Sequence, residues 1–538
     1  MNLPLVLLLT WAGIHGVHYV LKGRNSEALL PTARGVNPLD RQLRARFWNT
    51  RTTQVVLNKL HIRVQTSAWN VTHDALSKAL LLRPRSRLRA HLTHFYNVGC
   101  AVGVLGTFLS LGLLLWTVGD SIVPIVHAAL RPPTPPSSSA LLLKRGLEEA
   151  AGRSAVIKPI IPGVTVPLGH LPSILLAVFL SQIIHELGHA VSAALDAVPV
   201  MTAGASFTVV VPAAFVTFPA TALESLKPFA RSRIIAAGPF HNLVFWCLLL
   251  FVERIGAGDL ITSMMYRDVS DVGRVVVKID EDSDLRGHLP IGSVVTKLDD
   301  TSLGTHADQW TAYLTTTQRP PDLGWCVDRA VYLGNSQSCC EPHATFSPLT
   351  CFVAVSSSAE KGCVDAIPIL TGKDEQRCRL DLDCAADALQ CVRPDESANI
   401  LRLGVYANGQ DEVVLWSGPL AEVYEQVDVG KLFPRFRLLP LWIYTSTRLF
   451  WVYLKMATMS LYLFNLLPLP YLDGAQFIHA LSDMTLHAGS AYDEYDIEAL
   501  AASTSNRGRW KERLAKSISV ATLCLFVLST ILAMTHVR

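Results

Sequence analysis

The chain has 538 residues, of which 50% are hydrophobic and 17% are charged. Because soluble globular proteins contain about 25% charged residues, this composition indicates a membrane protein. The formal net charge of +3 is small for this length and gives no indication of nucleic-acid binding.

Six apolar stretches are long enough to cross a bilayer, whose hydrocarbon core of about 30 Å needs about 20 helical residues. The first lacks a basic leading segment and a clear small-residue cleavage site, so we interpret it as an anchor and not as a signal peptide. We therefore expect a polytopic α-helical membrane protein with about six transmembrane helices. The predicted spans are 3–21, 97–117, 171–195, 233–253, 440–464 and 516–535.

Two connecting segments have distinct compositions. Residues 22–95 carry fourteen Lys and Arg against three acidic residues, which is typical of a cytosolic segment. Residues 96–170 contain the second span and then PPTPPSSS, a composition that favours an extended linker. We expect this Pro/Ser-rich linker to be luminal.

The apolar stretch at 201–220, MTAGASFTVVVPAAFVTFPA, is interrupted by Gly204, Pro212 and Pro219 and does not favour a helix. Its SFTVVV portion at 206–211 predicts a strand. Strand edges cannot face lipid, so we expect a β-hairpin that dips into the membrane where protein shields it. A cytosolic hairpin is the alternative.

A large insert follows the fourth span. From Gly273, short β-rich runs alternate with Gly and Asp turns, and HADQWTAYLTTT then predicts a helix. Residues 254–320 resemble a PDZ domain, which would bind an extended peptide at a sheet edge. A small β-domain without a ligand is the alternative.

Residues 321–436 hold eight of the eleven cysteines. An even number of cysteines in a loop-rich segment indicates disulfides formed in an oxidising lumen, with the pairing left open. A zinc site is the alternative, although no CxxC pair repeats at zinc-ribbon spacing. The eight are Cys326, Cys339, Cys340, Cys351, Cys363, Cys378, Cys384 and Cys391.

A luminal insert fixes the predicted topology by parity. The 233–253 helix then runs from cytosol to lumen, and the 171–195 helix runs the opposite way. Residues 22–95 fall in the cytosol, in agreement with their basic excess. Glycosylation of the sequon at Asn70 would overturn this topology.

The sequence HELGH at 185–189 lies inside the third span. His185 and His189 share one helix face, and HExxH uses this spacing to hold zinc, with the glutamate as a base toward water. Ionisable groups in hydrocarbon cost about 2.5 kcal/mol or more each and usually mark a function. A structural polar cluster is the alternative.

Catalytic zinc takes three protein ligands, so one more is needed. Asp196 lies two helical turns beyond His189 and is too far to share an ion with it. Asp473 stands out because NLLPLPYLDGAQ places it after a span, where prolines break the helix. The other acidic or histidine candidates are Glu224, His241 and His479.

Three motifs resemble the signature of the site-2 proteases, the intramembrane zinc metalloproteases of peptidase family M50. They are HELGH at 185–189, AGPFHN at 237–242 and NLLPLPYLDG at 465–474. The longer layout, with a PDZ-like insert and a cysteine-rich segment, is similar to the eukaryotic branch that acts on membrane-bound transcription factors.

The resemblance implies that His185, His189 and Asp473 hold one catalytic Zn²⁺ and that Glu186 is the catalytic base. It assigns Asn465 to a donor toward the substrate carbonyl or the developing oxyanion; a helix-capping role is the alternative. Asn242 is similar to the asparagine of the second motif, with a simple interhelical hydrogen bond as the alternative. His479 has no counterpart and is expected to pack or lie at the surface.

The expected activity is hydrolysis of a peptide bond within the transmembrane segment of membrane-tethered proteins, after a first luminal cut. The substrates implied by the resemblance are precursors of transcription regulators, with the 206–211 strand as a candidate edge for the unwound segment. The catalytic core is expected at 171–253 and 437–480, followed by a linker and a last helix at 481–538. A Golgi or endoplasmic reticulum membrane is the expected location.

Two other classes of function remain at this point. Intramembrane His and Asp also mark ion paths in metal transporters, although internal repeats expected of a transporter are not visible in the sequence. A catalytically inactive adaptor could keep the fold, but Glu186 is present together with all three expected ligands.

Overall fold

The computed structural model describes sixteen ranges of the chain and separates it into two compact units, 1–254 with 448–538 and 255–447. The PPTPPSSS linker and most of 22–51 lie outside the described residues. The described ranges are 8–17, 46–47, 52–82, 87–130, 160, 162–304, 308–316, 323–334, 337–340, 349–356, 360–372, 376–386, 388–407, 409–436, 439–487 and 497–536.

Four helices in the described ranges are long and apolar enough to cross a membrane. They overlap four of the six predicted spans. The other two spans stay predictions. At the first, Leu8–Val17 is a shorter apolar helix. At the fifth, α13 (Leu441–Asn465) is a helix of 25 residues that is not among the four. The four lie in α3 (Arg87–Leu130), α5 (Leu171–Leu195), α7 (Pro228–Arg254) and α15 (Ile497–His536).

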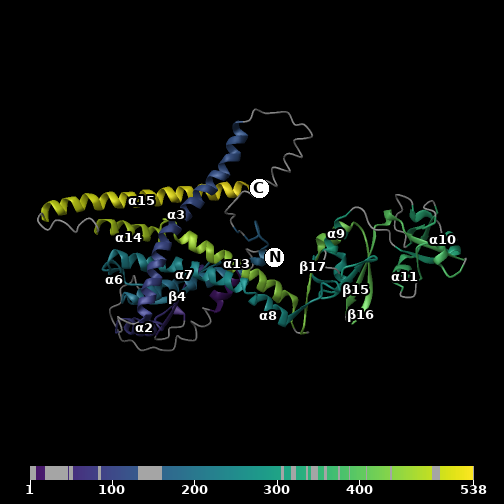
Figure 1. The fold of residues 1–538 in the computed structure, drawn as a ribbon, viewed down its shortest axis with the longest axis horizontal. Helices are drawn as coiled ribbons and strands as arrows, with labels where there is room; N and C mark the ends of the chain where they lie inside the picture. The colour runs from purple at the N-terminus through teal and green to yellow at the C-terminus, as the bar shows by residue number, and fades with distance from the viewer. Residues whose placement is uncertain are drawn as a thin grey trace. The chain divides into compact units, whose positions relative to one another are not determined.

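Helix α7 lies at the centre of the first unit, where it packs against α3, α5 and α14 (Asp473–His487) (Figure 1). Ala237 of α7 is buried with Tyr96 of α3 and Leu195 of α5. Its neighbour Ala236 is buried with Phe477 of α14. Small side chains on α7 thus allow three helices to approach it closely, as is common where lipid supplies no hydrophobic driving force between helices.

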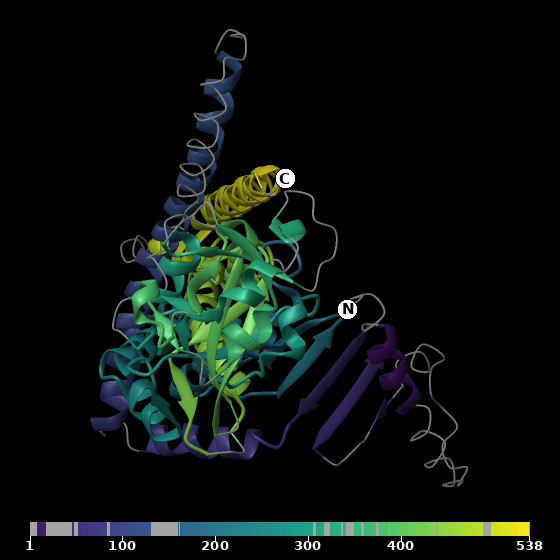
Figure 2. The same cartoon turned by 90° about the vertical axis from the view of Figure 1, so that its right-hand side faces the viewer.

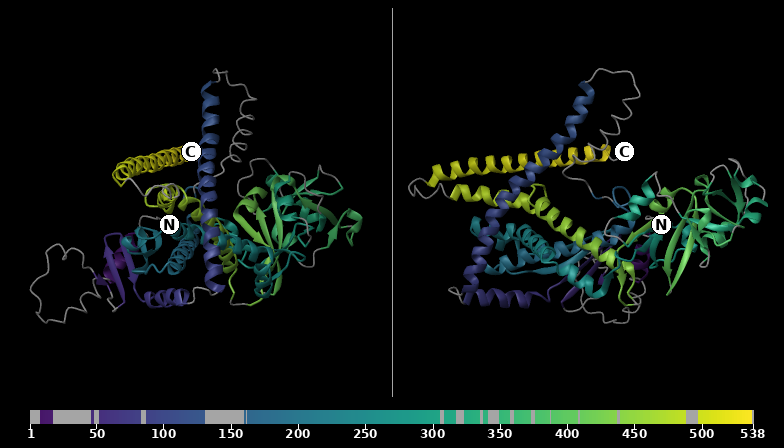
Figure 3. Two further views of the ribbon diagram at one scale, coloured as in Figure 1. Left: turned by 60° about the vertical axis from the view of Figure 1, so that its left-hand side comes forward. Right: turned by 45° about the vertical axis from the view of Figure 1, so that its right-hand side comes forward.

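Helix α15 packs against α3, and the right-hand view of Figure 3 shows these two long helices crossing. Leu114 of α3 is buried beside Leu467 and Leu469, and Leu525 and Phe526 of α15 pack against the same cluster. The chain that leads into Asp473 is therefore packed between two long helices.

The predicted hairpin at 201–220 is present as strands β4 (Thr202–Thr208) and β5 (Val211–Thr217). They complete a five-stranded antiparallel sheet in the order β1-β2-β3-β4-β5, whose purple and teal strands follow one another in Figure 2. The first three strands are β1 (Arg46–Phe47), β2 (Thr53–Asn58) and β3 (His61–Thr66).

The prediction of a free strand edge at 206–211 is wrong. Residues 206–208 end β4, which pairs with β3 on one side and β5 on the other, and Val209 occupies the turn with φ 58°. Continuous β-branched residues conceal the turn because no Gly, Asn or Pro marks it. The outer strands of the sheet are β1 and β5.

The second unit contains a sheet in the order β16-β15-β8-β7-β17, with β9 paired to β8. The predicted helix is present as α9 (Gln309–Thr315), and Trp310 and Tyr313 pack with Val423 of α12 (Leu420–Gln426) in the core. A PDZ-like function stays a prediction. The strands are β7 (Arg274–Ile279), β8 (Val294–Leu298), β9 (Thr301–Ser302), β15 (Ile400–Ala407), β16 (Gln410–Ser417) and β17 (Val427–Gly430).

This sheet extends past the boundary expected at residue 320, because three of its strands come from 400–430. The cysteine-rich part is an insertion with its own sheet in the order β12-β11-β14-β10-β13 and its own core around Tyr332, Phe352 and Val392. Its strands are β10 (Gly324–Asp328), β11 (Thr350–Ala354), β12 (Lys361–Val364), β13 (Arg377–Cys378) and β14 (Leu389–Pro394).

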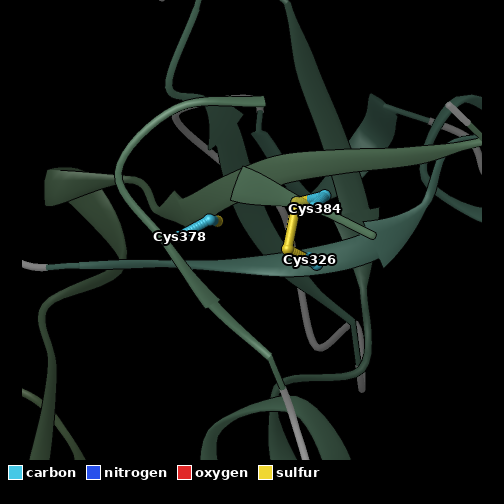
Figure 4. Close-up of side chains that lie close together, drawn as sticks. All are labelled: Cys326, Cys378 and Cys384. Atoms are coloured by element: carbon cyan, nitrogen blue, oxygen red, sulfur yellow. A yellow bond between two sulfur atoms is a disulfide. The ribbon is translucent and has the colours of Figure 1, made fainter. Parts of the chain in front are cut away.

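All eight cysteines of the insertion form disulfides, so these side chains do not supply thiolates for the zinc alternative. Figure 4 shows the Cys326–Cys384 bond with Cys378 beside it; Cys378 is itself bonded to Cys391. The remaining pairs are Cys339–Cys363 and Cys340–Cys351.

Short elements connect these parts. The helices are α2 (Asn70–Leu82), α6 (Ala220–Glu224), α8 (Ala257–Met265), α10 (Arg329–Gly334) and α11 (Ala366–Thr371). A two-stranded ribbon of β6 (Tyr266–Asp268) and β18 (Leu432–Pro434) pairs the two ends of the second unit. Single 3-10 turns are Leu168–His170, Asp284–Gly287, Gln337–Cys340, Asp381–Asp383 and Glu396–Ala398.

Candidate metal centre

Helix α5 carries the two histidines and the glutamate of HELGH on neighbouring faces. A proline in its first turn, where the missing N–H has no helical partner, favours the helix start. His185 and His189 are buried, at 6% and 8% exposure. Their rings lie one turn apart, with Nε2 of His189 3.1 Å from Nε2 of His185.

Asp473 is the first residue of α14 and meets the histidines from a segment 288 residues after His185. Its Oδ2 lies 2.8 Å from Nε2 of His185 and 3.4 Å from Nε2 of His189. Burial acts to raise the pKa of this carboxyl, but the two histidines beside it hold the pKa below its ordinary value. The carboxylate is the form that would bind a metal.

The turn before Asp473 is tightly packed. A Cβ at Gly474 would overlap the carbonyl oxygen of Leu467 and lie 2.5 Å from that of Leu466, so only glycine fits there. Tyr471 is fully exposed and has a φ of 70°, a left-handed conformation that is uncommon outside glycine. The chain accepts this conformation as it leaves α13 and turns into α14.

The three donor atoms fit a single zinc ion. Bonds of about 2.0–2.2 Å in a tetrahedral site place neighbouring ligand atoms about 3.3 Å apart, close to the observed 2.8, 3.1 and 3.4 Å. His189 presents Nε2 as a lone pair, because its Nδ1 lies 2.9 Å from the carbonyl oxygen of Ile234 and must donate to it. Converging lone pairs and a carboxylate together form a site that favours a bound cation.

One stripe of α7 lies against this group, formed by residues four apart. Ile234 supplies the carbonyl for His189. A Cβ at Gly238 would overlap Nε2 of His189 and lie 2.7 Å from Nε2 of His185. Asn242 is fully buried, with Nδ2 3.2 Å from Nδ1 of His185. The AGPFHN motif thus forms the wall behind the histidines. Gly238 and Asn242 are four residues apart, like the two histidines of HELGH, and this shared spacing could have indicated the role.

Strand β5 contacts the face of α5 that carries Glu186, through hydrogen bonds from its backbone N–H groups to side chains. The N–H of Val216 donates to Oε2 of Glu186 at 2.9 Å, and the N–H of Ala214 donates to Oε1 of Gln182 at 2.9 Å. These two N–H groups point away from β4, since alternate residues of an antiparallel strand face opposite edges. Gln182 and Val216 are site residues that sequence reasoning missed.

The other candidate ligands lie elsewhere. Asp196 forms an ion pair with Arg233, with both carboxylate oxygens within 2.7 Å of Nη2. Nε2 of His241 lies 2.9 Å from the hydroxyl of Tyr96. Glu224 ends α6, and His479 lies within α14. Asn465, which is expected as a donor to the substrate and not as a metal ligand, is the last residue of α13. Among the described residues, only one His/Asp group converges, His185, His189 and Asp473.

Comparison with known proteins agrees with this geometry. The sequence model of peptidase family M50 matches residues 173–493, which include all three motifs. The chain is 30% identical over 138 residues to the "Membrane-bound transcription factor site-2 protease homolog" of Arabidopsis thaliana. That alignment covers 26% of this chain and 26% of the relative, so the chain matches about a quarter of the relative's length.

Proposed function

The chain belongs to peptidase family M50, and we propose that it is an intramembrane zinc metalloendopeptidase. The observation that carries the proposal is the convergence of His185, His189 and Asp473 within a bundle of membrane-length helices. Nε2 of each histidine and Oδ2 of Asp473 would hold one Zn²⁺. The donor set of two imidazoles and a carboxylate leaves a position open, as catalytic zinc sites do.

Glu186 serves as the general base in this proposal. A zinc ion bound here would polarise the scissile carbonyl and make water a stronger acid. Glu186 takes the proton from the attacking water and delivers it to the nitrogen of the leaving amine. Because Oε2 accepts the hydrogen bond from Val216, Oε1 is the oxygen left for proton transfer. Asn465 would donate to the carbonyl oxygen of the substrate.

The substrate is a transmembrane segment that must unwind, since a helix hides its peptide bonds within its own hydrogen bonds. An extended chain pairs with the edge of a sheet, and the strand nearest the base is β5. Its outward N–H groups at Ala214 and Val216 already donate to side chains of α5, so capture of the unwound segment at β5, in place of 206–211, requires the segment to displace these contacts. The expected substrates are membrane-tethered precursors of transcription regulators that a first luminal cut has shortened.

The topology proposal places the disulfide-bonded insertion in an oxidising lumen of the Golgi or endoplasmic reticulum. Residues 22–95 are then cytosolic. Asn70 agrees with this side, because its Nδ2 donates to the carbonyl of Met201 at 2.9 Å and a glycan on that nitrogen would compete with this contact. The PDZ-like sheet would read or exclude the luminal end of a substrate.

Metal dependence tests the proposal. The purified protein should contain one zinc per chain, and removing the metal with a chelator should stop cleavage of a reporter transmembrane segment in liposomes. Adding Zn²⁺ should restore cleavage. Asp473→Ala should lose the metal, because two histidines alone bind zinc more weakly.

The matched control is Asp483→Asn, a change on the same helix, α14. This variant should keep both zinc and cleavage. Full cleavage by zinc-free protein, or by Asp473→Ala without zinc, would contradict the proposal. Zinc binding with transport of the ion and no cleavage would support the transporter class.

A further inference from the structure

Asn242 has an unexplained arrangement at the candidate metal centre. Its side chain is fully buried, and Nδ2 lies 3.2 Å from Nδ1 of His185. Its Oδ1 is buried and has no hydrogen-bond partner among the residues that the structure describes. A buried carbonyl oxygen without a partner is destabilising, so this position needs a physical reason.

The chemistry of the two histidines indicates which end of the Asn242 amide should face Nδ1 of His185. An imidazole that binds a metal through Nε2 carries its proton on Nδ1 and donates it to an acceptor. His189 has this arrangement already, because its Nδ1 faces the carbonyl of Ile234. For His185 the same arrangement requires an oxygen beside Nδ1, whereas an amide nitrogen there would compete as a second donor.

We propose that Asn242 is a positioning residue whose Oδ1 accepts the Nδ1–H of His185 and thereby fixes the tautomer that presents Nε2 to the metal. Turning the amide by 180° exchanges its two nearly equivalent ends. It replaces the donor–donor contact with a hydrogen bond from Nδ1 of His185 to Oδ1, and Nδ2 then takes the buried position in which Oδ1 has no partner. The inference rests on the proposed function insofar as it requires a metal at Nε2.

The position of Asn242 on α7 supports a specific role over a general interhelical hydrogen bond. Ile234, Gly238 and Asn242 lie at i, i+4 and i+8, and all three contact the imidazoles. The stripe thus supplies an acceptor for one ring, room for both rings, and an acceptor for the other ring. By contrast, the buried pair Ser181–Thr458 joins α5 to α13 through a contact of 2.8 Å between two hydroxyls and not through an imidazole.

Zinc affinity, measured by competition with a chromophoric chelator on purified protein, tests the role without relying on activity. Asn242→Leu keeps the volume and removes the acceptor, and it should weaken zinc binding by about 10–100-fold, as loss of an outer-shell partner typically does. Asn242→Asp retains an acceptor oxygen and should bind zinc at least as tightly as the unaltered protein. The control Thr458→Ala removes a buried interhelical hydrogen bond and should leave zinc affinity unchanged.

Nitrogen-15 NMR of histidine-labelled, zinc-loaded protein tests the same inference on the unaltered protein, so it does not depend on whether a variant folds. Both ligand rings should show a protonated Nδ1 and a metal-bound Nε2. Ligation of His185 through Nδ1 would overturn the inference, as would wild-type affinity in Asn242→Leu or equal weakening in Asn242→Asp and Asn242→Leu. Absence of zinc from the unaltered protein would instead identify a failure of the proposed function.

Discussion

Gly238 shows most directly how one residue constrains the site. Any side chain at this position would occupy the space in which Nε2 of both histidines lies. Because α7 is packed on three sides, it has little freedom to move away. Glycine here is required by the close approach of a helix to two imidazole rings and not by its backbone conformation.

We expect Gly238→Ala to abolish stoichiometric zinc binding and reporter cleavage, since the new methyl group displaces the histidines. Zinc content and cleavage rate are the measurements. Gly112→Ala on α3 is the control, because a Cβ at Gly112 meets nothing within 4 Å and alanine favours a helix over glycine by about 1 kcal/mol. Normal zinc content in Gly238→Ala would contradict the packing account.

At the scale of single residues, the sequence predicted the converging group but not what surrounds it. HExxH spacing places His185 and His189 on one face, and the broken helix around LPLPYLDG indicated Asp473. The contacts of Gly238, Gln182 and Val216 depend on how α7 and β5 pack against α5. Such contacts between elements leave no local periodic signal, although the spacing of 234, 238 and 242 was available.

At the scale of elements, strand β5 holds Glu186, the proposed base, in place. The N–H groups of Ala214 and Val216 both point toward α5 and do not pair with β4. Proline at either position removes one outward N–H and keeps the pairing with β4, as is tolerated at a sheet edge. The two positions therefore form a matched pair of variants.

We expect Val216→Pro to lower kcat about tenfold or more, because it releases the carboxylate of Glu186 and a lost hydrogen bond to a charged group is worth about 1.5–3 kcal/mol. Zinc content should stay normal. Ala214→Pro removes only the contact with Gln182 and should affect kcat much less. Equal losses in both variants would show that the hairpin acts through its general integrity and not through Glu186.

The helices and strands differ in how well the sequence pattern predicts them. Long apolar helices at α3, α5, α7 and α15 carry a strong signal because they need about 20 apolar residues each. The hairpin was predicted but its turn was not, since SFTVVV has no turn residue. The sheet of the second unit was only half predicted, because pairing between 274–302 and 400–430 is non-local.

At the scale of the whole molecule, the second unit can be removed at a defined place. The N–H of Val269 donates to the carbonyl of Lys431 at 2.9 Å, and β6 pairs with β18 next to it. The chain therefore enters and leaves this sheet at neighbouring points. A deletion limited to 273–316 would remove β7 and β8 from the middle of the sheet and would expose its core.

Replacing 271–429 with a short Gly-Ser linker should leave zinc binding intact and should allow cleavage of substrates that have not received the luminal cut. The reason is that the disulfide-bonded unit would no longer bind or sterically exclude the luminal end of the substrate. Cleavage of cut and uncut reporters is the measurement. Unchanged selectivity would end the filter role while leaving the protease proposal in place.

In the proposed function, Glu186 performs the chemistry at a metal held by three other side chains. Glu186→Gln keeps the volume of the side chain and removes the base, so it should retain one zinc per chain and lose reporter cleavage by several orders of magnitude. Glu224→Gln, at the end of α6, should behave like the unaltered protein. The most direct measurement is zinc content and cleavage on the same preparation of Glu186→Gln: bound zinc without cleavage is predicted, and bound zinc with undiminished cleavage would contradict the account.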